Sequence, residues 1–151
     1  DHLDQSMDIA KEIKDDMRYH YYHFGKGYIY FQQKEYAQAM DGNLSKWYEW
    51  FTENGKDISL RDMGIYLVCL KKLNRDYDLS RLETLMKETP ERKYHYELNY
   101  MLYQLYDDRS YLKSSYEKIM DLKSNLDKKT GDKFINYPLE SEIIEAYQSI
   151  S

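Results

Sequence analysis

The chain has little cysteine, which stabilises many small proteins through disulfides, and little proline or glycine, which are common in the turns of β-rich folds. Its 151 residues include one cysteine, two prolines and six glycines. A lone cysteine cannot form an internal disulfide, and Cys69 lies in the apolar run 65–70. We therefore expect a buried thiol in a reducing, cytoplasmic setting. That run is the longest apolar stretch and is far shorter than the ~20 residues needed to cross a bilayer, so we expect no membrane partner.

Charge of one sign is not concentrated anywhere along the sequence. The formal net charge is −5, and lysine and arginine are interspersed with aspartate and glutamate. No basic stripe is available to bind a phosphate backbone, so we expect no direct nucleic-acid contact. The sequence opens at Asp1, without methionine, inside a helical pattern. We expect an excised segment of a longer protein.

The apolar residues recur at helical spacing, and alternating strand patterns are lacking. This predicts an all-α fold with about seven or eight helices. The expected helices span residues 3–14, 17–33, 35–52, 60–73, 81–87, 90–106, 111–127 and 138–150. Ile13 belongs to the apolar face of the first helix, and residues 128–136 are expected to form a polar linker. Short connections predict about three antiparallel hairpins over 17–127, flanked by helices 3–14 and 138–150, in one domain over 1–151.

Tyrosine is abundant, with eighteen copies, and part of it recurs with the predicted hairpins. The stretches 27–40 (GYIYFQQKEYAQAM), 68–82 (VCLKKLNRDYDLSRL) and 102–116 (LYQLYDDRSYLKSSY) share one pattern. In each, bulky residues end one helix, a charged turn follows, and a tyrosine stands at or near the start of the next helix. Tyr77 and Tyr111 are 34 residues apart. Periods of this size are typical of helical repeats.

The first of these stretches resembles a tetratricopeptide repeat. The family's alternation of small and aromatic positions corresponds here to Gly27, Tyr30, Tyr36 and Ala39. The small residues would let two helices approach closely while the rings fill the space beside them. The resemblance implies antiparallel hairpins stacked as a right-handed superhelix that binds a protein or peptide.

Residues 96–150 are similar in style to the last repeat and exit helix of sensory repeat regions that precede bacterial signalling output domains. This similarity implies the regulatory or sensory part of a larger signalling or transcription-regulating protein.

The helix expected over 90–106 carries two separate stripes. One is an apolar stripe formed by Leu98, Met101, Leu102 and Leu105. The other stripe is Tyr96, Asn99, Tyr103 and Tyr106, and its counterpart in the first repeat includes Tyr21, Phe24 and Tyr28. In the resembled family this face lines the concave groove, so these seven residues are the predicted peptide site. The alternative is that these rings pack against neighbouring helices.

The cluster of Trp47, Trp50 and Phe51 covers a broad face of the helix expected over 35–52. These side chains either pack against the following helix or form a partner surface, because exposed aromatics of this size mark interfaces. The second possibility leads to an alternative function, a self-association scaffold that forms a homodimer and has no groove ligand.

No catalytic motif stands out, so we expect neither an enzyme nor a cofactor. His20 and His23 are three residues apart on one predicted helix, a spacing that could place both near a metal ion. A metal site needs further ligands, so we expect no metal and instead half-buried histidines that form hydrogen bonds with tyrosines. Cys69 lacks a histidine partner for a nucleophilic role.

Overall fold

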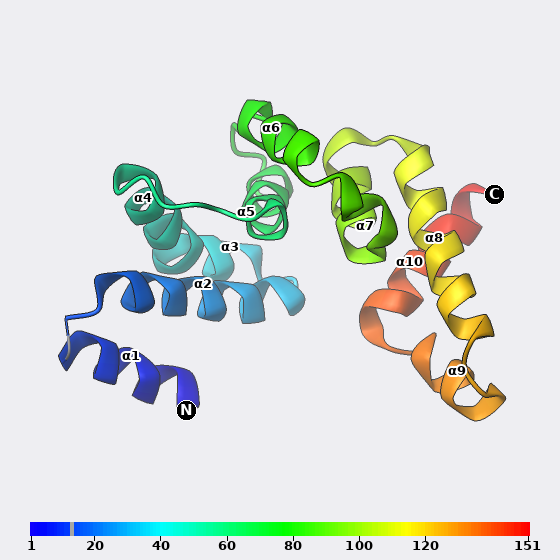
Figure 1. Cartoon of the computed structure of the whole chain (residues 1–151), viewed down its shortest axis with the longest axis horizontal. Coiled ribbons are helices and arrows are strands. Elements are labelled where there is room, and N and C mark those ends of the chain that lie inside the picture. The colour runs from blue at the N-terminus through cyan, green and yellow to red at the C-terminus, as the bar shows by residue number, and fades with distance from the viewer. Residues whose placement is uncertain (13) are drawn as a thin grey trace. The chain divides into compact units, whose positions relative to one another are not determined.

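The computed structural model describes residues 1–12 and 14–151, and among them there are helices and no strand (Figure 1). This confirms the all-α prediction. Ile13 lies outside the described residues. The elements are α1 (His2–Glu12), α2 (Asp16–Gln32), α3 (Tyr36–Ala39), the π-helical turn η1 (Met40–Leu44), α4 (Ser45–Glu53), α5 (Leu60–Lys72), α6 (Ser80–Glu88), the 3-10 turn η2 (Pro90–Tyr94), α7 (Tyr96–Tyr106), α8 (Arg109–Ser124), α9 (Lys128–Phe134) and α10 (Pro138–Ile150). None of the helices that these residues form has the length and apolarity that a bilayer crossing requires.

The chain divides into two compact units, Asp1–Leu79 and Ser80–Ser151, called unit 1 and unit 2 below. Each unit has its own buried side chains. The single domain expected over residues 1–151 stays a prediction.

In unit 1, α2 packs against helices on two sides. The antiparallel α1 lies on one side, where a Cβ atom at Gly25 would lie 3.5 Å from Leu3 Cδ2 and the Lys11 ammonium lies 5.3 Å from the centre of the Tyr19 ring. The segment from α3 to α4 lies on the other side, also antiparallel to α2. There Phe24 packs on Trp47, with ring centroids 4.8 Å apart.

Gly27 is the point of closest approach between α2 and this second layer. A Cβ atom at Gly27 would lie 2.6 Å from Leu44 Cγ and 2.9 Å from the Ala39 carbonyl oxygen. Ala39 and Leu44 are themselves fully buried. Helix α2 can therefore approach α3 and η1 here because residue 27 has no side chain. Gly27 and Ala39 are the two small residues of the repeat pattern in the sequence.

The prediction of a single helix over residues 35–52 was wrong, because the backbone breaks at Asp41 and Gly42. Asp41 has ψ 115°, outside the helical range, and Gly42 has φ +78°. That positive φ is readily adopted by glycine and costs other residues energy. The break leaves α3 and α4 as two short helices, and the Arg75 guanidinium binds the Asp41 carboxylate at 3.0 Å.

The predicted helix over 90–106 is also interrupted. His95 is extended, with φ −109° and ψ 111°, so that η2 and α7 are separate elements. Conversely, the polar linker expected over 128–136 contains α9. Asp127 caps that helix, since one carboxylate oxygen accepts from the Thr130 amide at 3.0 Å and the other from the Thr130 hydroxyl at 2.6 Å. A capping side chain of this kind can initiate a helix in a polar sequence.

In unit 2, α7 and α8 form an antiparallel hairpin that is closed by α10. Ser115 donates a hydrogen bond to the Tyr96 carbonyl at 2.7 Å near one end of the hairpin. The core of the unit is Tyr100, Leu112, Ile119 and Ile143. The last of these belongs to α10, which spans the residues predicted from the sequence.

We expect Gly27→Ala to destabilise unit 1, because the added methyl group would overlap Leu44 and a backbone oxygen. Overpacking of this kind costs about 1–3 kcal/mol. Both tryptophans of the chain lie in unit 1. Urea unfolding followed by tryptophan fluorescence therefore reports on this unit.

The matched control is Gly25→Ala on the same helix. Its Cβ would lie at an ordinary 3.5 Å from Leu3 Cδ2, and alanine is the better helix former by about 1 kcal/mol. The control should be neutral or stabilising. Equal effects of the two substitutions would contradict the close approach at Gly27.

Candidate ligand-binding surface

One face of α2 carries Met17, Tyr21, Phe24 and Tyr28, spaced three or four residues apart. Phe24 is buried with 4% of its surface exposed, whereas Met17 and Tyr21 are exposed to 52% and 49%. Tyr28 is half-buried. The predicted groove residues of α2 therefore divide, because the ring of Phe24 belongs to the core and the two tyrosines reach the surface.

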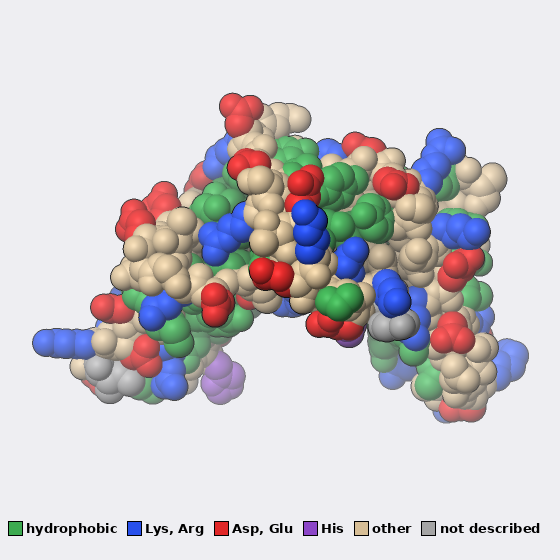
Figure 2. Space-filling view, turned by 45° about the horizontal axis from the view of Figure 1, so that its top comes forward, with side chains coloured by type: hydrophobic (Ala, Val, Ile, Leu, Met, Phe, Trp, Pro, Cys, Tyr) green, Lys and Arg blue, Asp and Glu red, His purple; other side chains and the backbone are tan. Residues whose placement is uncertain are grey.

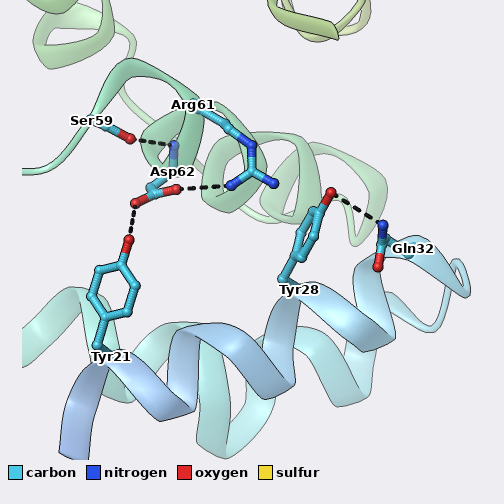
Figure 3. A network of polar contacts seen from close by, with 6 residues as sticks. All are labelled: Tyr21, Tyr28, Gln32, Ser59, Arg61 and Asp62. Carbon is cyan, nitrogen blue, oxygen red and sulfur yellow. Dashed lines mark hydrogen bonds and ion pairs between the residues drawn. The ribbon is translucent and has the colours of Figure 1, made fainter. Parts of the chain in front are cut away.

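The exposed ring of Tyr21 is held in place by its hydroxyl group. The hydroxyl donates to Asp62 Oδ2 on α5 at 3.2 Å (Figure 3). Asp62 is itself buried, with 6% exposed, while its backbone amide donates to Ser59 Oγ at 3.1 Å. That last bond caps the N-terminus of α5. Tyr21 thus bridges α2 and α5.

The second tyrosine of this face lies beneath an arginine. The guanidinium carbon of Arg61 lies 4.5 Å from the centre of the Tyr28 ring, a cation–π geometry. Arg61 also contacts Asp62 Oδ1 at 3.4 Å, and Tyr28 accepts a hydrogen bond from Gln32 at 3.1 Å (Figure 3). We call the set Ser59, Tyr21, Tyr28, Gln32, Arg61 and Asp62 the α2–α5 surface.

The electrostatics of this surface are dominated by the burial of Asp62. Burial raises the pKa of this carboxyl above 3.8, against the lowering effects of Tyr21, Arg61 and Ser59. Burial, together with the Asp62 carboxylate, likewise raises the pKa of the Tyr21 hydroxyl. The proton of Tyr21 is therefore retained at neutral pH, so the network fixes the orientation of an aromatic ring and does not offer a reactive phenolate.

In unit 2, the predicted stripe on α7 contacts other residues of the same unit. The Tyr96 hydroxyl donates to Glu140 of α10 at 2.5 Å. Asn99 is buried and donates to backbone carbonyl groups, including that of His95 at 3.0 Å. Tyr103 packs against the core of unit 2.

Tyr106, at the end of α7, also has partners within unit 2. Its hydroxyl approaches the Met86 sulfur at 3.9 Å, and its ring lies 6.2 Å from that of Tyr111. Burial, with Glu83 nearby, raises the pKa of the Tyr106 hydroxyl. The two predicted halves of the groove, on α2 and on α7, lie in different units.

The aromatic cluster of α4 is part of the interior of unit 1. Trp47 is fully buried and Phe51 is 5% exposed. Trp50 is half-buried and stacks on His20, with centroids 4.8 Å apart and planes 8° from parallel. The neighbouring Tyr48 stacks on Tyr66 of α5 at 4.1 Å. The cluster thus packs within its own unit, with its ring contacts mainly to α2 and less to the following helix that the sequence analysis named.

The two histidines of α2 do not form the expected hydrogen bonds to tyrosine. His20 Nδ1 donates to the Asp16 carbonyl at 2.8 Å. His23 meets Tyr19 edge-on at 4.9 Å, and neither of its ring nitrogens has a partner among the described residues. Cys69 is buried on α5, and burial raises the pKa of its thiol to about 12. In the described part of the chain, no three His, Cys, Asp or Glu side chains are grouped so as to hold a metal ion.

Sequence reasoning missed the residues that anchor the tyrosines, namely Arg61, Asp62 and Glu140. Asp62 carried one signal, its place three residues after Ser59 in a cap. Glu140 carried none, because its partner Tyr96 is 44 positions away. Figure 2 shows acidic and basic side chains interspersed over the face in view, without an extended area of one sign.

Comparison with known proteins adds no family, since no family model, curated protein or solved structure matches this chain.

We expect Asp62→Asn to change how the stability of unit 1 depends on pH. A carboxyl whose folded pKa is raised binds more protons folded than unfolded, so its contribution to stability is lost as pH rises above 3.8. The amide has no such dependence and still accepts from Tyr21. The free energy of unfolding of the variant, minus that of the native chain, should therefore rise as the pH increases above 3.8. The total rise should be about 1.4 kcal/mol for each unit by which folding raises the pKa of Asp62.

Urea unfolding at several pH values measures this difference. Asp57→Asn removes an exposed carboxylate of the same unit and serves as the control. A stability difference for Asp62→Asn that does not change with pH would contradict the assignment.

We expect Tyr96→Phe to destabilise unit 2, because it removes a donor from the buried carboxylate of Glu140. A polar group buried without its partner costs about 1–3 kcal/mol. Hydrogen exchange of the α10 amides measures the loss. Tyr137→Phe is the control, since its ring is 48% exposed, and it should leave the exchange unchanged.

Proposed function

We propose that this chain is a protein-binding helical module that holds an extended peptide segment, and that its hairpins stack in the right-handed, tetratricopeptide-like manner. The observation that carries the proposal is that Tyr21 is both exposed and anchored through its hydroxyl. The residue is 49% exposed while its hydroxyl is bound to the buried Asp62 carboxylate. An exposed aromatic side chain with a fixed orientation loses little rotamer entropy when a partner covers it.

The neighbouring side chains extend this surface. Met17 lies one helical turn from Tyr21 and is 52% exposed. The Arg61 guanidinium lies over the ring of Tyr28, which is half-buried. Tyrosine, methionine and arginine are the side chains enriched where proteins bind one another. A peptide that crosses α2 and α5 here would meet apolar area at Met17 and Tyr21 and a cation at Arg61.

The stacking part of the proposal is supported by the antiparallel packing in each unit. In unit 1 the contact of Gly27 with Ala39 and Leu44 is the small-residue approach on which tetratricopeptide-like hairpins depend. In unit 2, α7 and α8 form the matching hairpin. The proposal extends to a regulatory or sensory role within a larger cytoplasmic signalling or transcription-regulating protein, which is the setting that the style of residues 96–150 implies.

Self-association remains the alternative function, but the side chains that suggested it offer little surface. Trp47 is fully buried and Phe51 is 5% exposed. Peptide binding at the α2–α5 surface is therefore the function that the geometry favours.

A peptide selection tests the proposal. A library of random twelve-residue peptides is selected on the whole chain, and the affinities of the enriched peptides are measured by fluorescence anisotropy. We expect Tyr21→Ala to weaken binding about tenfold or more, the loss typical of an interface hot spot. Tyr21→Phe keeps the ring but removes the anchor to Asp62, so we expect a smaller loss.

Tyr137→Ala is the matched control, since it removes a tyrosine of similar exposure, 48%, from unit 2. It should leave affinity unchanged. A second variant, Tyr103→Ala with Tyr106→Ala, measures whether the α7 stripe takes part. Unchanged affinity of Tyr21→Ala, with its helical circular dichroism intact, would refute the proposed surface.

A further inference from the structure

His23 occupies the layer in which α2 packs against η1 and α4. Two of its neighbours on α2 contact that layer, since His20 stacks on Trp50 and Phe24 packs on Trp47. One turn further along α2, Gly27 meets Leu44. His23 is 7% exposed. Its imidazole ring is therefore enclosed at the interface that holds unit 1 together.

Among the groups that act on the ring, Asn43 alone favours a second proton. Both of its nitrogens are buried and, among the described residues, neither has a hydrogen-bond partner. The side chain of Asn43 in η1 acts on the ring in favour of the charged form, because its carbonyl oxygen can accept while its amide nitrogen donates to the Gln38 carbonyl at 3.0 Å. Burial of the ring outweighs this effect on the pKa of His23. The neutral ring is compatible with this enclosure, whereas an imidazolium would be a buried charge.

The charged groups around the ring also oppose protonation. Lys46 comes from α4, and His20 and Lys26 come from α2 itself. Each is a cation or can become one. From α1, Lys11 lies over the ring of Tyr19, which in turn meets His23 edge-on. Burial first, and then these cations, lower the pKa of His23 below 6.5.

We propose that protonation of His23 separates α2 from η1 and α4, so that unit 1 is closed at neutral pH and opens in acid. Because α2 carries Tyr21 and Tyr28, this opening also dismantles the α2–α5 surface. The second step rests on the proposed function, whereas the first concerns the fold of unit 1 alone and needs no ligand.

The direction of the pH dependence follows from proton linkage. A histidine with a lowered folded pKa binds fewer protons folded than unfolded, so stability is lost as pH falls through 6.5. While folded His23 stays neutral, each pH unit below this point should raise the unfolding constant of unit 1 by about tenfold. Asp62 acts in the opposite direction, since its raised pKa favours the folded state in acid.

The test is urea unfolding of the whole chain between pH 7.5 and 5, followed by tryptophan fluorescence, with His23→Phe as the main variant. Phenylalanine keeps a buried ring and cannot be protonated. We expect the native chain to lose stability more steeply with falling pH than the variant does. The difference between the two cancels the contributions of Asp62 and the other carboxylates.

A control variant and a direct titration of His23 complete the test. His95→Phe removes an exposed histidine of unit 2 and should leave the pH dependence of unit 1 unchanged. If His23→Phe does not fold, the imidazole resonances of the native chain give the titration of His23 directly by nuclear magnetic resonance. A His23 that accepts a proton at pH 6.5 while unit 1 stays folded would overturn the proposal, as would identical pH profiles of the native chain and His23→Phe.

Peptide affinity at each pH separates this inference from the proposed function. Loss of binding in acid for the native chain but not for His23→Phe would connect the two. Acid opening without any selected peptide would leave the switch established and refute the ligand surface.

Discussion

A tyrosine hydroxyl bound to a carboxylate on another helix is the interaction on which both units depend. Tyr21 binds Asp62 between α2 and α5, and Tyr96 binds Glu140 between α7 and α10. Tyr100 repeats the arrangement with Glu142 at 3.1 Å. A tyrosine ring contributes apolar area to a helix interface, but its hydroxyl needs a partner once water is excluded. A carboxylate from the adjacent helix satisfies that need and, because hydrogen bonds are directional, also fixes how far one helix can slide along the other.

This requirement separates the tyrosines into those that close a unit and those that also present a surface. The ring of Tyr100 is 7% exposed and belongs to the core of unit 2. Tyr21 uses the same kind of bond, but the residue is 49% exposed. Polar anchoring thus does two tasks in one chain, since it stabilises a helix pair in unit 2 and orients an exposed ring in unit 1. The second task is what connects the fold to the proposed binding of peptides.

Much of the helical architecture could be predicted from local sequence, whereas the partners of the tyrosines could not. Gly27 provides the close approach that the repeat pattern suggested. The break at Gly42 was missed because the apolar residues on both sides keep helical spacing, although Asp41 and Gly42 form a dipeptide typical of turns. The face of α2 was predicted as a set, but burial of Phe24 beside exposed Tyr21 depends on where α4 lies. The choice of Asp62 among many acids depends on contacts 41 positions apart, which helical periodicity cannot supply.

The reactivity of Cys69 reports on how tightly unit 1 is packed. It is the chain's single cysteine, it is fully buried on α5, and burial raises the pKa of its thiol to about 12. Since the thiolate is the reactive form, this sulfur is inert toward alkylating reagents for as long as the helices around it stay closed. Each reaction at Cys69 therefore records a transient exposure of α5, and the chain carries at one position a built-in measure of how often its own interior becomes accessible.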